Sequence, residues 1–369
     1  MGPLQGLKVV EIAGMGPAPF CAMLLADMGA DVVRVERANA PERGIPTPAR
    51  FEVLNRGRRS ISLDLKTPIG LQTLLRLVGR ADILLEGFRP GVMERLGAGP
   101  EVCNAANPRL IYGRMTGFGQ DGPLAHASGH DLNYIAMTGA LASIGPADGE
   151  PVVPLNLIGD FGGGGMLLAV GLLAAYVESL RSGLGQVVDA AMTDGTALLM
   201  ASTFGLKAAG LWRTQRGTNI LDGGAPWYGV YMTADTRHVS LAAIEPRFYE
   251  ELLQLMGLDG TTLPSRDNRD KWPELRKILS ECIAHRTLKQ WQELLEGTDA
   301  CFAPVLSLDE APTHPHMISR GTFTSPNGVL QPAPAPRFSR TPSTLGRPPP
   351  TPGEHTDDVL RDWGVWLPA

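Results

Sequence analysis

The first 36 residues alternate between strand and helix patterns, and this alternation restricts the fold more than any other feature of the chain. Residues 7–12 indicate a strand, residues 20–28 a short helix that ends at Gly29, and residues 31–36 a second strand. A strand, a helix and a strand in this order form a right-handed unit with parallel strands. We therefore predict a Rossmann-like α/β domain built on a parallel sheet.

The alternation continues to about residue 190 and then changes. Further strand patterns occur at residues 60–65, 81–86, 110–114 and 186–190. After a Gly-rich stretch at 217–226, two short strands precede several amphipathic helices, which is typical of an α+β region. We expect four segments: a large α/β domain (1–190), a connecting helix and linker (191–226), a small α+β domain (227–325), and a Pro-rich segment returning to the large domain (326–369).

Composition excludes several classes of function. The 369 residues carry a net charge of −5 and show no Lys/Arg cluster, so nucleic-acid binding is not expected. The four cysteines lie far apart and form no C-x-x-C pair, which is typical of reduced core thiols without a disulfide frame or metal site. The N-terminus shows no signal-peptide pattern, and the apolar stretch 161–177 is shorter than the roughly 20 residues of a membrane span. We expect a cytoplasmic protein without a membrane span.

A dinucleotide site is suggested by the first turn but is not favoured. Gly14-Met15-Gly16 begins the pattern G-x-G-x-x-G, and Glu36 lies where a ribose-binding acid would be expected. The third glycine of the pattern is replaced by Pro19, which loses the close contact between helix and strand. We interpret the segment as a Gly/Pro turn of an α/β sheet.

One carboxylate stands in front of the most apolar helix pattern of the chain. Asp160 is followed by Phe161 and four glycines, and residues 166–177 are almost all apolar, as in a buried helix. The start of a helix exposes unpaired N–H groups and partial positive charge. Asp160 is therefore either an N-cap or an acid held where negative charge is stabilised.

Basic residues and histidines supply further candidates. Arg56 to Lys66 indicates either a solvated basic edge or a site for phosphate groups. Arg89 and Arg95 follow a strand at the carboxyl edge of the predicted sheet, where ligands bind in such folds. His130 precedes a helix pattern that runs to about residue 142, and His126 lies four residues earlier, so the sequence does not separate the two.

An ordered series of short motifs resembles the family III CoA-transferases. Gly129-His130-Asp131 and Gly159-Asp160-Phe161 together resemble the α-methylacyl-CoA racemase branch of that family. The resemblance extends from about residue 4 to residue 340. The other motifs are Leu7 to Glu11, Asp27 to Val32, Leu63 to Lys66, Glu86 to Gly91, Thr116 to Gly119, Gly185 to Asp189, Ile244 to Pro246 and Ala303 to Val305.

The resemblance implies a role for each matching residue. His130 and Asp160 would be the acid/base pair, and Glu245 would hold the histidine. It also implies an interlaced homodimer. Phe88 departs from the family pattern, which has a tyrosine-type residue there, so one hydroxyl is missing near the CoA. The implied CoA and substrate contacts are Arg37, Leu63, Asp64, Leu65, Lys66, Gly87, Phe88, Arg89, Arg95, Gly129, Asp131, Leu132, Asn133 and Tyr134.

The implied reaction is the interconversion of (R)- and (S)-2-methylacyl-CoA in lipid and fatty acid metabolism. Inversion of the α-carbon needs a base on one face and an acid on the other, and a histidine and a carboxylate supply both. No cofactor is implied, since CoA is part of the substrate. Two alternatives stay open: a CoA-transferase with Asp160 as nucleophile, which leaves His130 and Glu245 without a role, and a CoA-binding protein without catalysis.

The sequence does not define the acyl group, the pathway or the direction of proton transfer. Four methionines are candidates for an adaptable acyl surface, although helical methionines are commonly part of a core. They are Met115, Met137, Met192 and Met200.

Overall fold

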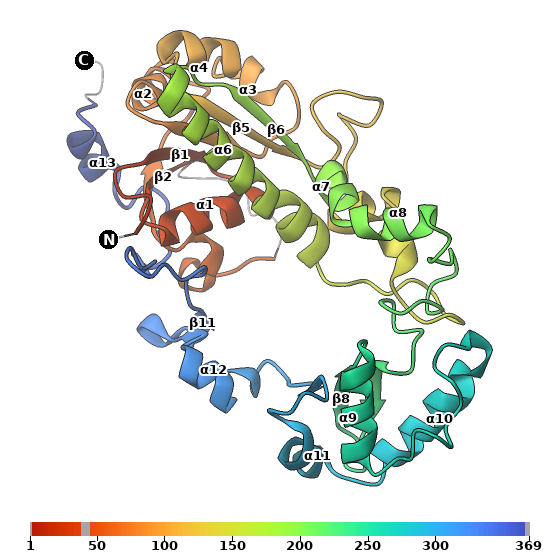
Figure 1. The fold of residues 1–369 in the computed structure, drawn as a ribbon. Coiled ribbons are helices and arrows are strands. Elements are labelled where there is room, and N and C mark those ends of the chain that lie inside the picture. The colour runs from red at the N-terminus through yellow and green to blue at the C-terminus, as the bar shows by residue number, and fades with distance from the viewer. Residues whose placement is uncertain (1, 38–44, 366–369) are drawn as a thin grey trace. The chain divides into compact units, whose positions relative to one another are not determined.

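The computed structural model describes residues 2–37 and 45–365, and the chain forms two compact units. The large unit comprises Met1–Thr138, Pro154–Met200 and Ser319–Ala369, and the small unit comprises Gly139–Val153 and Ala201–Ile318. Figure 1 shows the course of the chain through both units. Each unit is described by itself below.

A six-stranded sheet forms the centre of the large unit, and all of its paired strands are parallel. The strand order is β3-β2-β1-β4-β5-β6, which is the order of a Rossmann fold. The predicted α/β class and parallel sheet are therefore confirmed. The strands are β1 (Lys8–Ile12), β2 (Asp31–Glu36), β3 (Arg58–Ser62), β4 (Ile83–Glu86), β5 (Ile111–Thr116) and β6 (Val187–Ala191).

Helices cover both faces of this sheet because neighbouring strand residues point to opposite sides. Val9 packs into the core that α1 (Pro17–Asp27) and α6 (Leu167–Ser182) share with the sheet (Figure 1). Val10 belongs to the second core, to which four other helices contribute side chains. These are α2 (Pro68–Val78), α3 (Val92–Arg95), α4 (Pro100–Ala106) and α13 (Thr356–Asp362).

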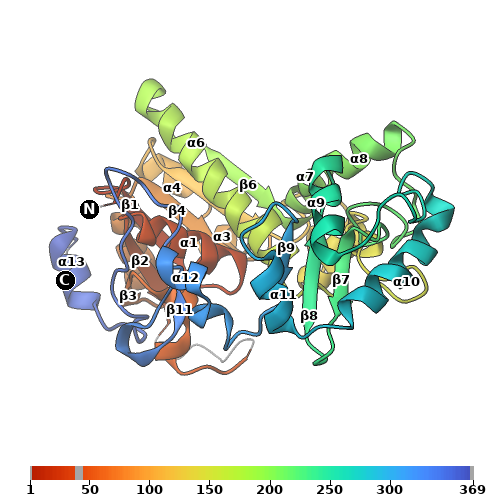
Figure 2. The same cartoon turned by 60° about the horizontal axis from the view of Figure 1, so that its bottom comes forward.

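The C-terminal segment contacts the edge of the same sheet (Figure 2). The N–H of His355 donates to the carbonyl of Ser60 over 2.9 Å, and Nε1 of Trp363 donates to Asp31 Oδ2 over 2.8 Å. Arg59 on β3 forms an ion pair with Asp362 on α13 at 2.8 Å. Helix α13 is therefore fastened to β2 and β3 by both apolar packing and polar contacts.

Several predicted element bounds were wrong. The strand expected at 60–65 is β3 (Arg58–Ser62), because the backbone turns at Asp64, whose carbonyl accepts the N–H of Thr67. The helix expected from 130 to 142 is α5 (Asp131–Met137), which is followed by Gly139 at a φ of +83°. The long helix expected at 194–211 is broken at Met200 into α7 (Met192–Leu199) and α8 (Ala201–Ala208).

A long apolar helical segment runs through the large unit from Leu157 to Ser182, and by length and composition it could cross a membrane. Its first ten residues, Leu157–Met166, form the π-helical element η4, and α6 follows directly. Leu168 and Leu172 pack into the core beneath the sheet. The segment therefore has the packing of a core helix on that face.

The small unit holds an antiparallel sheet in the order β7-β8-β9 with three amphipathic helices. Its core centres on Trp227, whose ring lies 5.3 Å from Trp272 and 5.9 Å from Tyr249. The elements are β7 (Tyr228–Met232), β8 (His238–Ala242), β9 (Phe302–Pro304), α9 (Pro246–Met256), α10 (Trp272–Ile283) and α11 (Leu288–Leu295). Further short elements include α12 (Pro315–Arg320), β10 (Phe323–Thr324) and β11 (Gln331–Pro332).

Candidate active site

The candidate site lies at the carboxyl edge of the sheet, where the strand order reverses between β1 and β4. Ligands of open parallel sheets bind at this point because the loops after the two strands diverge there. The loop after β1 contains Gly16 at a φ of +69°. A Cβ atom on Gly16 would lie 3.3 Å from Oδ2 of Asp160, so this carboxylate stands at the reversal point.

Asp160 lies within the first turn of η4, and the N-cap of that helix is Asn156. The interpretation of Asp160 as a plain N-cap was therefore wrong. The helix begins earlier than predicted because the glycines after Asp160 pack closely against neighbouring elements. A Cβ on Gly163 would lie 2.7 Å from the backbone nitrogen of Thr196, and one on Gly164 would lie 2.9 Å from Cβ of Pro17. Glycine ordinarily disfavours helix, but here only glycine fits.

Two hydrogen bonds fix the position of Asp160. Nδ2 of Asn156 donates to its Oδ2 over 2.9 Å, and its own backbone N–H donates to Oδ2 of Asp131 over 2.7 Å. Burial raises the pKa of Asp160, and the nearby charge of Asp131 adds to the rise. The hydrogen bond from Asn156 and the charge of His130 act in the opposite direction. A carboxyl group with a raised pKa is suited to acid/base work.

His130 directly precedes α5 and has an extended backbone, with a φ of −132°. Its N–H donates to Oδ1 of Asn133 over 3.1 Å, which holds the start of the helix, and its side chain is exposed. His130 is close enough to Asp160 for its charge to lower the pKa of that carboxyl. The geometry thus associates His130 with Asp160, whereas the sequence left His126 and His130 equal.

Tyr134 supports the segment that carries His130. Its hydroxyl donates to the carbonyl of Gly129, and its ring meets Phe118 edge-on at 4.9 Å. A Cβ on Gly117 would lie 2.0 Å from the Tyr134 ring, so that glycine makes room for it. Burial and the charge of Asp160 raise the pKa of Tyr134, while Arg89 lowers it. The hydroxyl therefore lies near both Asp160 and Arg89.

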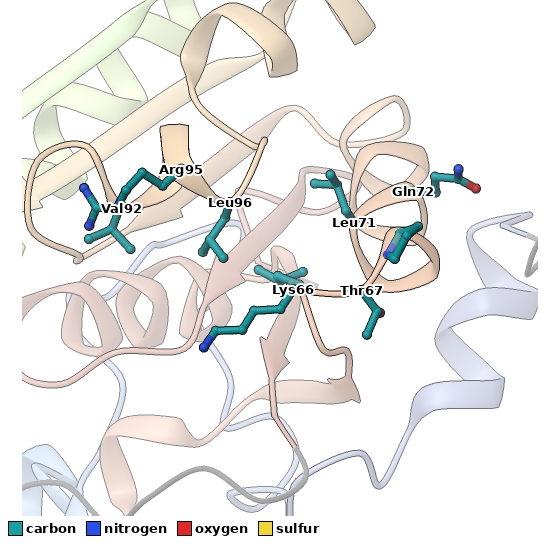
Figure 3. A pocket seen from close by; sticks show the side chains of 9 residues that line it. Lys66, Thr67, Leu71, Gln72, Val92, Arg95 and Leu96 are labelled. Atoms are coloured by element: carbon teal, nitrogen blue, oxygen red, sulfur yellow. The ribbon is translucent and has the colours of Figure 1, made fainter.

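A pocket of about 750 Å³ opens beside α2 and α3 (Figure 3). Lys66 and Arg95 contribute cationic groups, and Leu71, Val92 and Leu96 contribute apolar surface. Three of the predicted CoA contacts, Leu65, Lys66 and Arg95, line this pocket. Thr67, Pro68 and Gln72 complete the lining.

The other predicted contacts are distributed around this edge of the large unit. Nη2 of Arg89 donates to Oγ of Ser128 over 2.6 Å, and both side chains are exposed. Leu63 is buried in the core below the pocket, whereas Asp64 is exposed and accepts the N–H of Lys66 at 3.1 Å. Exposed positions are Arg37 after β2, Gly87 after β4, and Leu132 and Asn133 in α5, and Phe88 is half-buried.

Glu245 lies in the small unit, where it is exposed and is the N-cap residue of α9. Its carbonyl accepts the N–H of Tyr249 over 3.0 Å, and its side chain makes no cap hydrogen bond. The structure therefore describes His130 and Glu245 in separate units.

Three arginines considered for phosphate binding form ion pairs within the protein instead. Arg58 is fully buried, and its Nε lies 3.0 Å from Glu11 Oε2. Arg56 pairs with Asp27 at 2.6 Å, and Arg59 pairs with Asp31 at 2.7 Å. Both the solvated basic edge and the phosphate site were therefore wrong for these residues, while Lys66 remains exposed.

Sequence reasoning missed Asn156 and the buried carboxylate Glu86. Asn156 stands four residues before Asp160, a spacing that brings side chains together on a helix face, so this signal was available. The role of Glu86 depends on contacts with another strand, which no local pattern indicates. In the part of the chain that the structure describes, no group of three or more His, Cys, Asp or Glu residues could hold a metal ion.

The comparisons with known proteins agree with this fold and these motifs. The family model of CoA-transferase family III matches residues 4–356, and the chain belongs to that family. Within the family, it is 47% identical to alpha-methylacyl-CoA racemase of Mus musculus and 46% identical to that of Homo sapiens. Each alignment covers 98% of this chain and 93% of the relative. A CAIB/BAIF family protein from Brucella suis has a similar solved structure, with a TM-score of 0.82 and 27% identity over 98% of this chain and 99% of that one.

Proposed function

We propose that this protein is an isomerase that interconverts (R)- and (S)-2-methylacyl-CoA thioesters by removing and returning the α-proton. The observation that carries the proposal is the position of Asp160, whose pKa burial raises, beside Gly16 at the reversal point of the sheet, with His130 near enough for its charge to act on that carboxyl. The two relatives at 46–47% identity, which are named alpha-methylacyl-CoA racemases, support the same reaction.

The chemistry needs two groups that exchange protons with one carbon. One group removes the α-proton as a base, and the other returns a proton to the opposite face as an acid. For the opposite enantiomer the two roles are exchanged, so each group must function in both protonation states. Asp160 and His130 are our candidates for these groups. A pKa of Asp160 above its ordinary value brings its affinity for protons closer to that of a histidine.

Removal of the proton leaves negative charge on the thioester oxygen. Backbone N–H groups at a helix start are suitable donors for such an enolate oxygen. The N–H of Asp160 is not one of them, because it is already donated to Asp131. Any backbone donors must therefore come from neighbouring residues at this edge.

The CoA part of the substrate accounts for the cationic groups around the pocket. Lys66 and Arg95 line it, and Arg89 lies exposed in the loop after β4. Lysine and arginine form charge-assisted hydrogen bonds with phosphate oxygens. We therefore assign the diphosphate and ribose phosphate of CoA to this region. We further propose that the reaction takes place in the cytoplasm and uses no metal or organic cofactor.

We also propose that the protein is an interlaced homodimer in which Glu245 of one chain supports His130 of the other chain. The support is an apolar stripe on α6 and the residue before it. Met166, Val170, Val177 and Leu180 are each between 49% and 64% exposed. Large exposed apolar side chains along one helix are typical of a protein interface. Sedimentation equilibrium of the purified chain tests this, and a monomer at micromolar concentration would contradict it.

The experiment that tests the function is incubation of one pure enantiomer of a 2-methylacyl-CoA with the protein and no free carboxylic acid. We expect both enantiomers to appear, approaching a 1:1 ratio because they are mirror images at the reacting carbon. Chiral chromatography after hydrolysis of the thioester measures the ratio. A turnover that requires an added carboxylate acceptor would support the transferase reaction instead.

A further inference from the structure

Glu86, the last residue of β4, is a fully buried acid outside the proposed proton-transfer pair. Its Oε2 accepts the backbone N–H of Phe88 over 2.6 Å, and its Oε1 accepts Nε of Arg114 over 3.2 Å. A buried carboxylate is costly unless such donors satisfy it. Both carboxylate oxygens of Glu86 are thus occupied by groups of the protein itself.

Arg114 extends this contact from β5 to α3. Its Nη1 lies 2.8 Å from Oε1 of Glu94, and its Nη2 donates to Oε2 of the same residue over 3.3 Å. The fork geometry of a guanidinium makes such a two-point contact specific in direction. The loop 87–91 is therefore fastened at its beginning through Phe88 and just beyond its end through Glu94.

The fastened loop and α3 carry two of the cationic groups that we assign to CoA. Arg89 lies within it and donates to Ser128, two residues before His130. Arg95 follows in α3 and lines the pocket (Figure 3). A Cβ on Gly91, at a φ of +79°, would lie 3.2 Å from Nη1 of Arg95, so the guanidinium of Arg95 lies close to the loop backbone.

We propose that Glu86 is a positioning residue for acyl-CoA: through the Phe88 N–H and the Arg114–Glu94 pair it holds the loop 87–91 so that Arg89 and Arg95 face the CoA phosphates. The proposal deepens the proposed function and rests on it for the identity of the ligand. Glu86 acts through the loop and not on the reacting carbon. Its loss therefore affects binding of CoA and not the proton-transfer step.

The ionisation of Glu86 gives a second signature. Burial raises the pKa of Glu86 to about 7, although the Phe88 N–H and the charge of Arg114 lower it. The charged and titratable groups that face it are Arg114 and Tyr112 on β5 and Glu94 on α3. Below pH 7 the carboxyl takes up a proton, and its hydrogen bonds lose their charge assistance. CoA binding should therefore weaken as the pH falls from 8 to 6, by more than in a variant without this acid.

The test compares Glu86→Gln with wild type and with Glu101→Gln, an exposed glutamate of α4 that serves as the matched control. Calorimetry gives the Kd of CoA, and racemisation kinetics give KM and kcat. We expect Glu86→Gln to raise both Kd and KM roughly tenfold, because a buried hydrogen bond to a charged group is lost. We expect kcat to change by less than about threefold, since binding and not chemistry is affected. The control should match wild type, and Glu86→Gln should lose the extra pH dependence of Kd.

A folded Glu86→Gln protein with an unchanged Kd, or with a reduced kcat and an unchanged Kd, would overturn the proposal. If that variant does not fold, Glu94→Gln tests the proposal instead. The Glu94 side chain is 43% exposed, so its replacement should be tolerated, and it pairs with the same Arg114 that contacts Glu86. An increase of its Kd by about threefold supports the proposal, and an unchanged Kd overturns it. Wild-type protein that binds CoA but does not racemise would refute the proposed function alone. Failure of wild type to bind CoA would refute both.

Discussion

The backbone N–H of Asp160 donates a hydrogen bond of 2.7 Å to Oδ2 of Asp131. This bond joins the first turn of η4, which carries Asp160, to the start of α5, which directly follows His130. It also brings a second, buried carboxylate next to Asp160, and that like charge favours the protonated form. The same contact therefore fixes the position of the proposed acid/base group and adds to the rise of its pKa that burial causes.

Replacing Asp160 by asparagine separates proton transfer from the other roles of this side chain. Asparagine has nearly the same shape and keeps an oxygen that can accept the Asn156 hydrogen bond. We expect racemisation to fall by about 10²–10⁴-fold, the usual contribution of a general acid/base. The Kd of CoA should stay near that of wild type in calorimetry. Near-normal turnover with reduced thermal stability would mean that Asp160 has only a structural role.

The same carboxylate distinguishes a racemase from a transferase in the wild-type protein. A transferase nucleophile attacks the acyl carbon and displaces CoA as a thiolate, which leaves an acyl anhydride on the aspartate. Hydroxylamine that attacks the aspartyl carbonyl then releases the acyl group as a free acid and leaves a hydroxamate on the residue. An acid/base group never bonds to the acyl carbon. We expect no mass increase on the peptide that contains Asp160 after treatment with acyl-CoA and hydroxylamine. An adduct at that residue would assign the protein to the transferase reaction.

The two histidines near α5 should respond differently to removal. His130 lies close enough to Asp160 to influence its pKa, and His126 belongs to the preceding exposed loop. We expect His130→Ala to lose about 10²–10⁴-fold in kcat/KM, and His126→Ala to retain nearly all activity. Steady-state kinetics on both variants measures this. Equal, modest losses at both positions would refute the role of His130.

Removal of the Asn156 amide should move the pH profile in a known direction. The hydrogen bond from Asn156 favours the ionised form of Asp160 and so lowers its pKa. In Asn156→Ala the pKa of Asp160 therefore rises further, and more of the base is protonated at any given acidic pH. We expect the acidic limb of the kcat/KM profile to move to higher pH in the direction that uses Asp160 as base. A limb that stays in place or moves to lower pH would contradict this account of Asp160.

The hydroxyl of Tyr134 should matter for geometry more than for contact with substrate. It donates to the carbonyl of Gly129, the residue before His130. Tyr134→Phe keeps the ring packed against Phe118 and loses this bond, at a cost of about 1 kcal/mol in the free energy of unfolding. We expect a few-fold decrease of kcat with little change in KM, as for a group that acts through His130. A large rise in KM with unchanged kcat would instead indicate direct contact with CoA.

Much of the architecture could be predicted because it depends on local sequence patterns. The alternation of strands and helices indicates the parallel sheet, and β1 and β2 lie within one residue of their predicted bounds. The Pro and Gly positions around α2 and α9 likewise mark where those helices begin and end.

The errors arose where distant residues override a local preference. Arg58 and Arg59 lie in a buried strand because Glu11 and Asp31 neutralise them from other strands. Glycines that disfavour helix lie inside η4 because Thr196 and Pro17 leave no room for a side chain. For the same reason the contact of Asp160 with Asp131, 29 residues earlier, could not be predicted from either motif alone.

The most direct test of the proposed reaction is incorporation of deuterium from solvent. The protein is incubated with one enantiomer of a 2-methylacyl-CoA in deuterated water, and C2 is followed by NMR together with the ratio of enantiomers. If the α-proton is removed and replaced on the opposite face, the product enantiomer carries deuterium at C2 from its first appearance. Retention of the original proton at C2 would contradict the proposed function, whether or not CoA is transferred to another carboxylic acid.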